Sequence, residues 1–373
     1  MTQTPERPRR RRIALLYGGR SAEHAVSVVS ARSVMEALDP DRFEVVPVAI
    51  TRAGAWLVSR TSPLELTAPS GGLPVVDAEG TTLAVRPDPG AASPLMVDTT
   101  HAAPAEVFGS VDVVFPLLHG PYGEDGTVQG LLELADLPYV GSGVLASALA
   151  MDKAMAKVVC AQAGLEQVAH LVVHERAWRA DPAPLAAEVG RRLGWPVFVK
   201  PARLGSSIGI SKAAGPGDLA PALETAFAHD AKVLVEQAVA ARELECGVIG
   251  LDDPQASVVG EVVPAHDFYD FEAKYLDESK LLIPAPVPEE VAARVREVAM
   301  AAWRALDCEG LARVDCFYEE ATGRVLLNEV NTIPGFTPKS MFPLLWQSSG
   351  ITYPELIARL VELALERHSR RKG

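Results

Sequence analysis

The first part of the chain alternates between short apolar runs and amphipathic stretches. Residues 13–17 are continuously apolar and predict a buried strand, and after a Gly-rich turn Val26, Val29 and Val34 recur at helical spacing. Two more apolar runs predict strands, at 43–50 and 111–118. Strands that alternate with helices indicate a parallel sheet, so we expect an α/β fold in this part.

Residues 58–105 break this pattern, because they are rich in Pro, Gly and Ala and carry few helix signals. They predict an insertion of loops with room for a hairpin. Beyond residue 150 the predicted helices lie at 151–164, 219–229, 288–306 and from Pro354 onward, and the predicted strands at 195–202 and 232–239. The pattern divides the chain into a disordered basic tail (1–12), an N-terminal α/β section (13–150), a central section (151–240) and a C-terminal section (241–373).

Charge separates the tail from the rest of the chain. The 373 residues carry 35 basic and 48 acidic side chains, a net charge of −13, but residues 1–12 hold five of the arginines and one glutamate. The remainder therefore has 30 basic and 47 acidic groups, a net charge of −17. An acidic body argues against nucleic-acid binding as the main function.

Apolar runs and cysteines indicate the compartment. No uncharged apolar run approaches the roughly 18 residues of a membrane helix, so no membrane contact is expected. The run after the tail ends at Gly18, shorter than the roughly 7 to 15 residues of a signal peptide. The four cysteines show no C-x-x-C spacing, and Cys308 and Cys316 lie in apolar sequence as predicted core thiols. These features predict a cytoplasmic protein.

The segment 311–336 predicts a β-hairpin, because two alternating runs are separated by a turn ending in Gly323. A three-residue loop with this glycine in the left-handed conformation places residue 320 opposite 324. The register then pairs Asp315 with Glu329 and Arg313 with Asn331.

Two carboxylates and an amide oxygen beside a guanidinium suit Mg²⁺, which prefers oxygen ligands. Asp315, Glu329 and Asn331 are therefore the candidate metal ligands. The alternative is charge pairing on a solvated sheet face, but two facing carboxylates would repel each other there.

A candidate phosphate site combines Lys153, Lys200 and the loop 203–209, which includes Ser206 and Ser207. Lys200 ends an apolar strand, where a lysine is costly to bury without an anionic partner. The backbone N–H groups and hydroxyls of a Gly/Ser loop can bind phosphate oxygens. The loop is not a Walker A motif, and a plain turn is the alternative.

Four further acidic or basic positions each have a functional and a structural interpretation. Glu236 is a candidate partner of an adenine amine and Glu243 of a ribose hydroxyl, although each is equally explained as a surface acid. Residues 18–24 lack the third glycine of a dinucleotide fingerprint. Glu23 there either holds a substrate ammonium or complements a helix dipole. His119 either orients a substrate or bonds a backbone carbonyl.

Seven segments, in order, closely resemble the D-alanine–D-alanine ligases, a family of the ATP-grasp superfamily. They are GGRSAEHAVS, HGPYGEDGTVQG, GSGVLASALAMDK, VKPARLGSSIGISK, FYDFEAKYL, RVDCFY and NEVNTIPGFTPKS. The resemblance extends from Ile13 over nearly the whole chain. It implies three α/β domains, with ATP held between the antiparallel sheets of the central and C-terminal domains. It also implies that one D-alanine carboxylate attacks the γ-phosphate to give an acylphosphate, which the amine of a second D-alanine converts to a dipeptide for peptidoglycan.

The resemblance assigns roles to residues of this chain. On the substrate side, Glu23 would bind the first ammonium and connect through Ser206 to Tyr275. Arg313 and the Gly335 amide would stabilise the oxyanion. Ser340 and Met341 would bind the carboxylate of the second D-alanine, and His119 is a further candidate for substrate binding. The ATP contacts would be Lys153, Lys200, Ser206, Ser207, Glu236, Gln237, Val239, Glu243 and Lys274.

The resemblance further implies two Mg²⁺ ions on Asp315, Glu329 and Asn331, with Mn²⁺ as an alternative metal, K⁺ as a candidate activator, and a homodimer. The chain departs from the family pattern at Gln237, where many members have lysine, and at Pro338-Lys339. Three alternatives remain open: a D-alanine–D-lactate ligase, a non-catalytic ATP-binding regulator, and a nicotinamide-dependent oxidoreductase. The broken dinucleotide fingerprint weighs against the last, and the intact metal set against the second.

Overall fold

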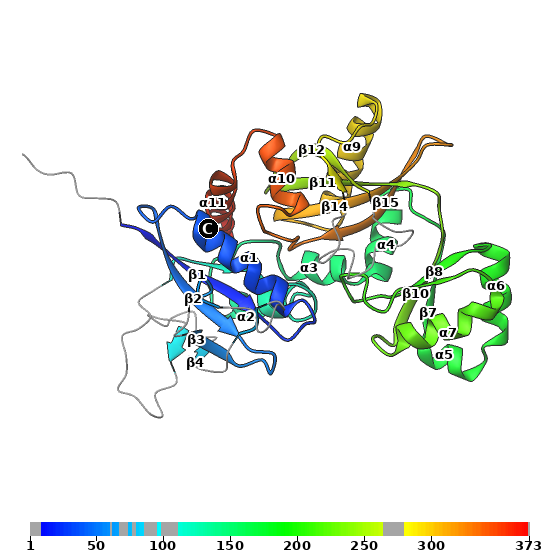
Figure 1. Cartoon of the computed structure of the whole chain (residues 1–373), viewed down its shortest axis with the longest axis horizontal. Helices are drawn as coiled ribbons and strands as arrows, with labels where there is room; N and C mark the ends of the chain where they lie inside the picture. Colours follow the sequence, from blue (N-terminus) through cyan, green and yellow to red (C-terminus); the bar gives the residue numbers. More distant parts are fainter. Residues whose placement is uncertain are drawn as a thin grey trace, which may run out of the picture.

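The computed structural model describes residues 9–59, 62–66, 74–76, 80–85, 95–97, 111–263 and 280–371. In these residues the chain forms three sheets, each from a different stretch of sequence (Figure 1). The first sheet is mixed, and the second and third are antiparallel. The predicted α/β class, with antiparallel sheets in the later sections, is confirmed.

The N-terminal sheet has the strand order β5-β4-β3-β2-β1-β6. Its elements are β1 (Arg11–Gly18), α1 (His24–Ala37), β2 (Phe43–Ile50), β3 (Trp56–Ser59), β4 (Gly80–Val85), β5 (Leu95–Val97), β6 (Val113–Pro116) and the following helices α2 (Thr127–Leu134) and α3 (Val144–Met151). As expected, β1 lies parallel to β2 and β6. The predicted insertion supplies β4 and β5, an antiparallel pair that extends the sheet.

The first strand begins two residues earlier than the apolar run predicts, so the predicted tail and β1 overlap. Arg11 pairs with Phe43 and Arg12 with Glu44 along β2. Asp112 accepts the Arg12 backbone N–H at 2.7 Å, and Arg12 Nε lies 3.1 Å from Glu44 Oε1. These carboxylates allow arginines to continue the strand beyond its apolar part.

The central sheet has the order β7-β10-β8-β9. Its elements are α4 (Lys153–Gln162), β7 (His170–His174), α5 (Glu175–Ala180), α6 (Ala183–Arg192), β8 (Val197–Pro201), β9 (Ser211–Ala213), α7 (Pro216–Phe227) and β10 (Lys232–Gln237). Alternate residues of β8 and β10, such as Val197, Val199, Val233 and Val235, pack against α7 in one core. The opposite face of this sheet is therefore left for polar side chains.

The C-terminal sheet has the order β13-β12-β11-β14-β15. Its elements are β11 (Arg242–Gly250), β12 (Gln255–Val263), β13 (Lys280–Leu282), α9 (Glu289–Ala305), β14 (Gly310–Glu319), β15 (Arg324–Asn331), α10 (Met341–Ser348) and α11 (Tyr353–Arg371). Helix α9 packs on one face through Val295, Val298 and Trp303. The side chains of the other face include Arg313 and Asp315.

The last helix does not pack only with its own section. Leu356, Ile357 and Leu360 of α11 share a core with Ile13 and Val28 of the N-terminal sheet and α1. Figure 1 shows α11 beside α1. The C-terminal end of the chain therefore holds the first sheet against the third.

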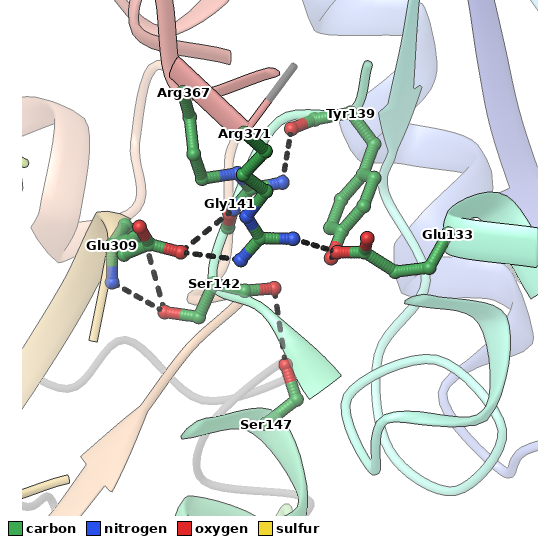
Figure 2. Close-up of polar contacts among 8 residues, drawn as sticks. All are labelled: Glu133, Tyr139, Gly141, Ser142, Ser147, Glu309, Arg367 and Arg371. Carbon is green, nitrogen blue, oxygen red and sulfur yellow. Dashed lines mark hydrogen bonds and ion pairs between the residues drawn. The ribbon is translucent and has the colours of Figure 1, made fainter. Parts of the chain in front are cut away.

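Polar contacts at the end of α11 strengthen this junction (Figure 2). Arg367, only 5% exposed, donates to the backbone oxygens of Gly141 and of Tyr139, the latter at 2.9 Å, and its guanidinium lies 4.2 Å from the Tyr139 ring centroid. Arg371 contacts Glu133, and its Nη2 lies 3.2 Å from Glu309 Oε2. We call this the C-terminal arginine cluster: Glu133, Tyr139, Gly141, Glu309, Arg367 and Arg371.

Two sequence-based expectations about the rest of the chain can be compared with the described residues. All four cysteines are buried free thiols, as predicted for Cys308 and Cys316. Within the described ranges, no helix combines the length and apolar composition needed to cross a bilayer.

Candidate functional site

A cavity of about 290 Å³ lies between the central and C-terminal sheets. Its walls come from β8 and β10 on one side, β11, β14 and β15 on the other, and the loop 204–207. Ten of the predicted site residues line it: Lys153, Lys200, Ser206, Ser207, Glu236, Gln237, Val239, Glu243, Asp315 and Glu329. Sequence positions up to 176 residues apart are thus brought to one cavity. Lys274 and Tyr275 lie outside the described residues.

The hairpin β14–β15 has the predicted register at the site, for a reason the sequence analysis missed. Asp315 pairs with Glu329 and Arg313 with Asn331. The turn, however, is one residue longer than predicted, because Glu319 pairs with Arg324. A β-bulge between Asp315 and Cys316 then shifts the register back. The error in the turn and the unpredicted bulge cancel, and the bulge adds Asn328 to the cavity wall.

Arg313 and Asp315 form the central ion pair of the site. Arg313 Nε donates to Asp315 Oδ1 and Nη2 to Oδ2, both at 2.8 Å, and Asn331 Nδ2 donates to the same Oδ2 at 2.9 Å. Arg313 Nε also lies 2.8 Å from Glu245 Oε2. Burial opposes the charge on Arg313, but Asp315 and Glu245 outweigh it and hold the pKa of the guanidinium well above its usual value.

Glu245 is a residue of this site that the sequence analysis missed. It belongs to β11, directly opposite Asp315, and is 8% exposed. Its sequence signal was the alternation Glu243–Glu245, which places both side chains on one face of the strand. That signal was incomplete, because only the pairing of β11 with β14 brings Glu245 to Arg313.

Lys153, a predicted phosphate contact, is paired with a carboxylate of the C-terminal sheet. Lys153 Nζ lies 3.2 Å from Glu329 Oε2 and donates to the Leu204 carbonyl at 2.9 Å. Burial lowers the pKa of Lys153, but Glu329 and the neighbouring acids outweigh it and leave the pKa raised. The Lys153 ammonium group therefore connects three parts of the site: α4, the Gly/Ser loop and β15.

Glu236 is paired with two lysines across the central sheet. Its Oε2 lies 2.6 Å from Lys200 Nζ and its Oε1 lies 3.0 Å from Lys157 Nζ. Burial raises the pKa of Glu236, but the two ammonium groups outweigh it and hold the pKa at about 2. The predicted anionic partner of Lys200 is therefore Glu236, while the predicted contact of Glu236 with adenine stays a prediction. Lys157 was missed, although its i+4 spacing from Lys153 on α4 was a usable signal.

Glu23 and Ser206 connect the N-terminal section to the Gly/Ser loop. Ser206 Oγ donates to Glu23 Oε1, and both residues are 8% exposed. A Cβ at Gly120 would lie 3.0 Å from Glu23 Oε2, and one at Gly205 would lie 3.3 Å from it. Glycine at both positions leaves room for this carboxylate, so the predicted link between Glu23 and Ser206 is present.

His119 bonds a backbone carbonyl, one of the two roles that its sequence context predicted. Its Nδ1 lies 3.0 Å from the Ile333 carbonyl oxygen and its Nε2 lies 3.4 Å from Ser30 Oγ. Burial lowers the pKa of the imidazole, which favours its neutral form. The histidine thereby joins the end of β6 to the loop that follows β15.

Glu124 lies beside His119 and was also missed, although its motif was recognised. Glu124 Oε2 accepts the Gly120 N–H at 2.6 Å and Oε1 accepts the Ile333 N–H at 3.2 Å. Burial and the nearby Glu23 raise the pKa of this carboxyl to about 8. A polar side chain that bridges two loops can be found only when both loops are in place.

The loop after β15 supplies the remaining predicted residues. Ser340 Oγ accepts the Thr337 N–H at 3.1 Å and stands at the N-cap of α10. The side chain of Met341 is buried against Val262 and Leu345, so the predicted contact with a substrate carboxylate would have to come from its backbone N–H. Gly335 lies close to Ser340, since a Cβ there would be 3.2 Å from the hydroxyl oxygen.

The donor chemistry of the predicted metal set fits a hard divalent cation. Asp315 and Glu329 offer carboxylate oxygens, and Asn331, whose Nδ2 donates to Asp315, has its amide oxygen as an acceptor. Among the described residues, no group of three His, Cys, Asp or Glu side chains is arranged to hold a metal. The predicted set, with two acids and one amide, would need oxygens from a bound phosphate to complete the coordination.

A cavity between two antiparallel sheets, lined by paired lysines and carboxylates, defines an ATP-dependent ligase of the ATP-grasp class. The family models for the N-terminus and C-terminus of D-Ala–D-Ala ligase match residues 12–142 and 159–362. The chain belongs to the D-alanine–D-alanine ligase family.

Individual relatives agree with this membership. The chain is 48% identical to a D-alanine–D-alanine ligase of Geobacillus kaustophilus, covering 97% of this chain and 96% of that one. It is 48% identical to one of Streptomyces griseus, covering 98% and 95%.

Two solved structures share the fold. The D-Ala:D-Ser ligase VanG of Enterococcus faecalis has a TM-score of 0.81 at 34% identity, covering 95% of this chain and 100% of that one. The D-alanine–D-alanine ligase of Coxiella burnetii has a TM-score of 0.81 at 31% identity, covering 97% of each.

Proposed function

We propose that this enzyme joins two D-alanine molecules to D-alanyl-D-alanine at the expense of ATP, as a step of peptidoglycan synthesis and thus of cell-wall formation. One observation carries the proposal: Asp315, which binds Arg313, and Glu329 share one cavity with Lys153 and Lys200, in a chain that both halves of the family match. This arrangement supports transfer of a phosphoryl group to a carboxylate.

In the first step, a carboxylate oxygen of one D-alanine attacks the γ-phosphorus of ATP. The bond from this phosphorus to the bridging oxygen breaks, leaving ADP and a D-alanyl phosphate. Lys153 and Lys200 bind the phosphates, and the amides and hydroxyls of Ser206 and Ser207 cover them. Lys274, outside the described residues, is a further proposed ATP contact. Catalysis of this kind consists mainly of positioning and charge stabilisation, which these side chains provide.

Asp315, Glu329 and Asn331 would hold the divalent metal. When bound, two Mg²⁺ ions, or Mn²⁺ in their place, would neutralise charge on the transferring phosphoryl group. The oxygen donors of these three residues support this choice.

In the second step, the amine of a second D-alanine attacks the acyl carbon and inorganic phosphate leaves. Glu23, which accepts a hydrogen bond from Ser206, binds the ammonium of the first D-alanine, and the proposal extends this link to Tyr275, which lies outside the described residues. The Arg313 guanidinium and the Gly335 N–H stabilise the tetrahedral oxyanion. The Ser340 hydroxyl and the Met341 N–H, at the start of α10, bind the second carboxylate, and His119 holds the adjoining loop in place.

The base and ribose of ATP would lie at the ends of β10 and β11. Glu236, Gln237 and Val239 contact the adenine, and Glu243 accepts a hydrogen bond from the ribose. All four residues line the cavity, which supports this placement.

The cellular setting is part of the proposal. The enzyme works in the cytoplasm as a homodimer, without nucleic acid or membrane, and K⁺ is a candidate activator. The proposed domains are the N-terminal (13–150), central (151–240) and C-terminal (241–373) sections, and the last two residues of the predicted tail (1–12) belong to β1.

Phosphate release with ATP, Mg²⁺ and D-alanine tests the function, with L-alanine and D-lactate as control substrates. Because one structural relative is a D-Ala:D-Ser ligase, the products of mixed assays with D-serine should also be identified by mass spectrometry. D-Alanyl-D-alanine as the main product near neutral pH is expected. A mainly mixed dipeptide or depsipeptide would redirect the assignment of the second substrate, and no phosphate release would refute the proposal.

A further inference from the structure

Three carboxylates lie side by side on adjacent strands of the C-terminal sheet. Glu245 on β11 pairs with Asp315 on β14, which pairs with Glu329 on β15. Directly paired residues of antiparallel strands point to the same face, and all three line the cavity. The predicted metal set uses two of the three carboxylates, so the third requires an explanation.

Arg313 separates Glu245 from Asp315. Its Nε lies 2.8 Å from Glu245 Oε2 and 2.8 Å from Asp315 Oδ1, and its Nη2 donates to Asp315 Oδ2 at 2.8 Å. The three side chains are 10% to 15% exposed. The single Nε–H donates to Asp315, so Glu245 serves Arg313 as a second negative charge at contact distance.

A divalent cation at Asp315 would change the electrostatics of this pair. The cation competes with the guanidinium for the Asp315 oxygens, which already accept hydrogen bonds from Arg313 and Asn331. It also repels the guanidinium, and such repulsion is strong where little water screens it. A second carboxylate beside Arg313 offsets that repulsion.

We propose that Glu245 is a positioning residue for phosphoryl transfer: it holds the Arg313 guanidinium as a second counter-ion, so that Asp315 can bind the metal while Arg313 stays beside the cavity. This inference rests on the proposed function, because it assumes that a metal–nucleotide complex binds at Asp315. Glu245 acts through Arg313, and no contact between Glu245 and the substrate is required.

Glu261 offers a matched control. It is also a buried acid of this sheet, on β12, 6% exposed, and Arg242 donates to it from Nε at 2.8 Å and from Nη2 at 2.7 Å. Glu261 pairs with Leu244 rather than Glu245, so it lies on the face opposite the cavity. Replacing it removes a comparable buried ion pair without touching Arg313.

The test measures the affinity of the full-length enzyme for ADP by calorimetry, with and without Mg²⁺. In E245Q, the metal-free affinity should stay within about twofold of wild type, while the gain from Mg²⁺ should shrink about tenfold, because Asp315 remains bound to Arg313. Turnover should fall by a similar factor with little change in KM for D-alanine. E261Q should keep the Mg²⁺ gain even if it melts at a lower temperature.

E245D restores the charge and should retain most of the Mg²⁺ gain, and it decides the question if E245Q does not fold. An undiminished gain in E245Q, or a loss in E245D as large as in E245Q, would overturn the proposal. Wild-type enzyme tests the proposed function separately: if it makes dipeptide and gains ADP affinity with Mg²⁺, a negative result for E245Q concerns Glu245 alone.

Discussion

Arg313 beside the cavity and Arg367 in the C-terminal arginine cluster are both largely shielded from solvent, with side chains 15% and 5% exposed, but the two arginines have different partners. Arg313 is surrounded by side-chain carboxylates, Asp315 and Glu245, and its pKa is raised by them against the effect of burial. Arg367 donates mainly to backbone carbonyl oxygens and lies on the Tyr139 ring, and burial lowers its pKa. Acids beside Arg313 can exchange partners with a ligand, whereas backbone carbonyls beside Arg367 fix the fold.

This comparison separates catalysis from stability, and mutations can test the separation. Changes around Arg313 should affect turnover or ligand binding more than folding. Changes around Arg367 should affect the stability of the fold more than turnover or ligand binding.

The largest effect is expected for Asp315→Asn. It removes the charge that balances Arg313 and would hold the metal, so turnover should fall about a thousandfold while the fold persists. Phosphate release and thermal melting measure the two properties. Glu319→Gln is the control, because Glu319 lies on the same strand but bonds Arg324 at the far end of the hairpin. Turnover of Asp315→Asn near the wild-type value would contradict this assignment.

Arg367→Met should mainly reduce stability. It keeps the apolar stem but leaves the Tyr139 and Gly141 carbonyl oxygens without their donor, so the free energy of unfolding should drop by about 3 kcal/mol. Urea unfolding measures the loss. Turnover per folded molecule should stay close to wild type, and a selective loss of turnover would show that the two clusters are coupled.

Lys200→Ala should weaken ATP binding about thirtyfold and D-alanine binding little, because Lys200 lines the cavity. Calorimetry with each ligand measures this. Lys212→Ala provides the control, since Lys212 is an exposed lysine of the same sheet whose Nζ lies 6.0 Å from the Phe198 ring centroid. Equal ATP affinity in both variants would leave Lys200 as a structural partner of Glu236.

Glu124→Gln should alter the pH dependence of stability. The folded-state pKa of Glu124 is raised to about 8, so between pH of about 4.5 and 8 the folded protein binds more protons than the unfolded chain. Stability from this group is therefore present at low pH and lost as the pH rises through about 8. Glutamine resembles the protonated acid, so Glu124→Gln should remove this loss of stability at high pH. The melting temperatures of the variant and of wild type between pH 5 and 9 measure the difference. An unchanged slope would contradict the raised pKa.

Arg371→Ala should have the smallest effect. Arg371 and Glu133 are partly exposed, and such surface pairs contribute about 0.5 kcal/mol. Urea unfolding of this variant and of Arg367→Met compares the stability contributed by the exposed arginine of the C-terminal arginine cluster with that contributed by the buried one. A loss as large as that of Arg367→Met would show that the cluster acts as one unit.

The parts of the site that could be predicted are those set by the alternation of side chains along one strand. Arg313 and Asp315 alternate on one strand, so their shared face follows from sequence alone. Their pairing with Asn331 and Glu329 was also predicted, but the bulge beside Asp315 was needed to compensate for the longer turn. A bulge depends on how neighbouring strands pack, and sequence alternation does not encode it.

The sequence by itself determined the alternation of strands and helices, the charged pairs within one hairpin, and membership of the family. Each of these depends on residues close together in the chain or on ordered motifs. Only the tertiary structure decided that Glu245 meets Arg313, that Lys157 shares Glu236 with Lys200, and that α11 packs on the first sheet. The physical reason is that these partners come from strands and helices whose pairing is selected by burial of whole faces, a property of the assembled layers rather than of any one segment.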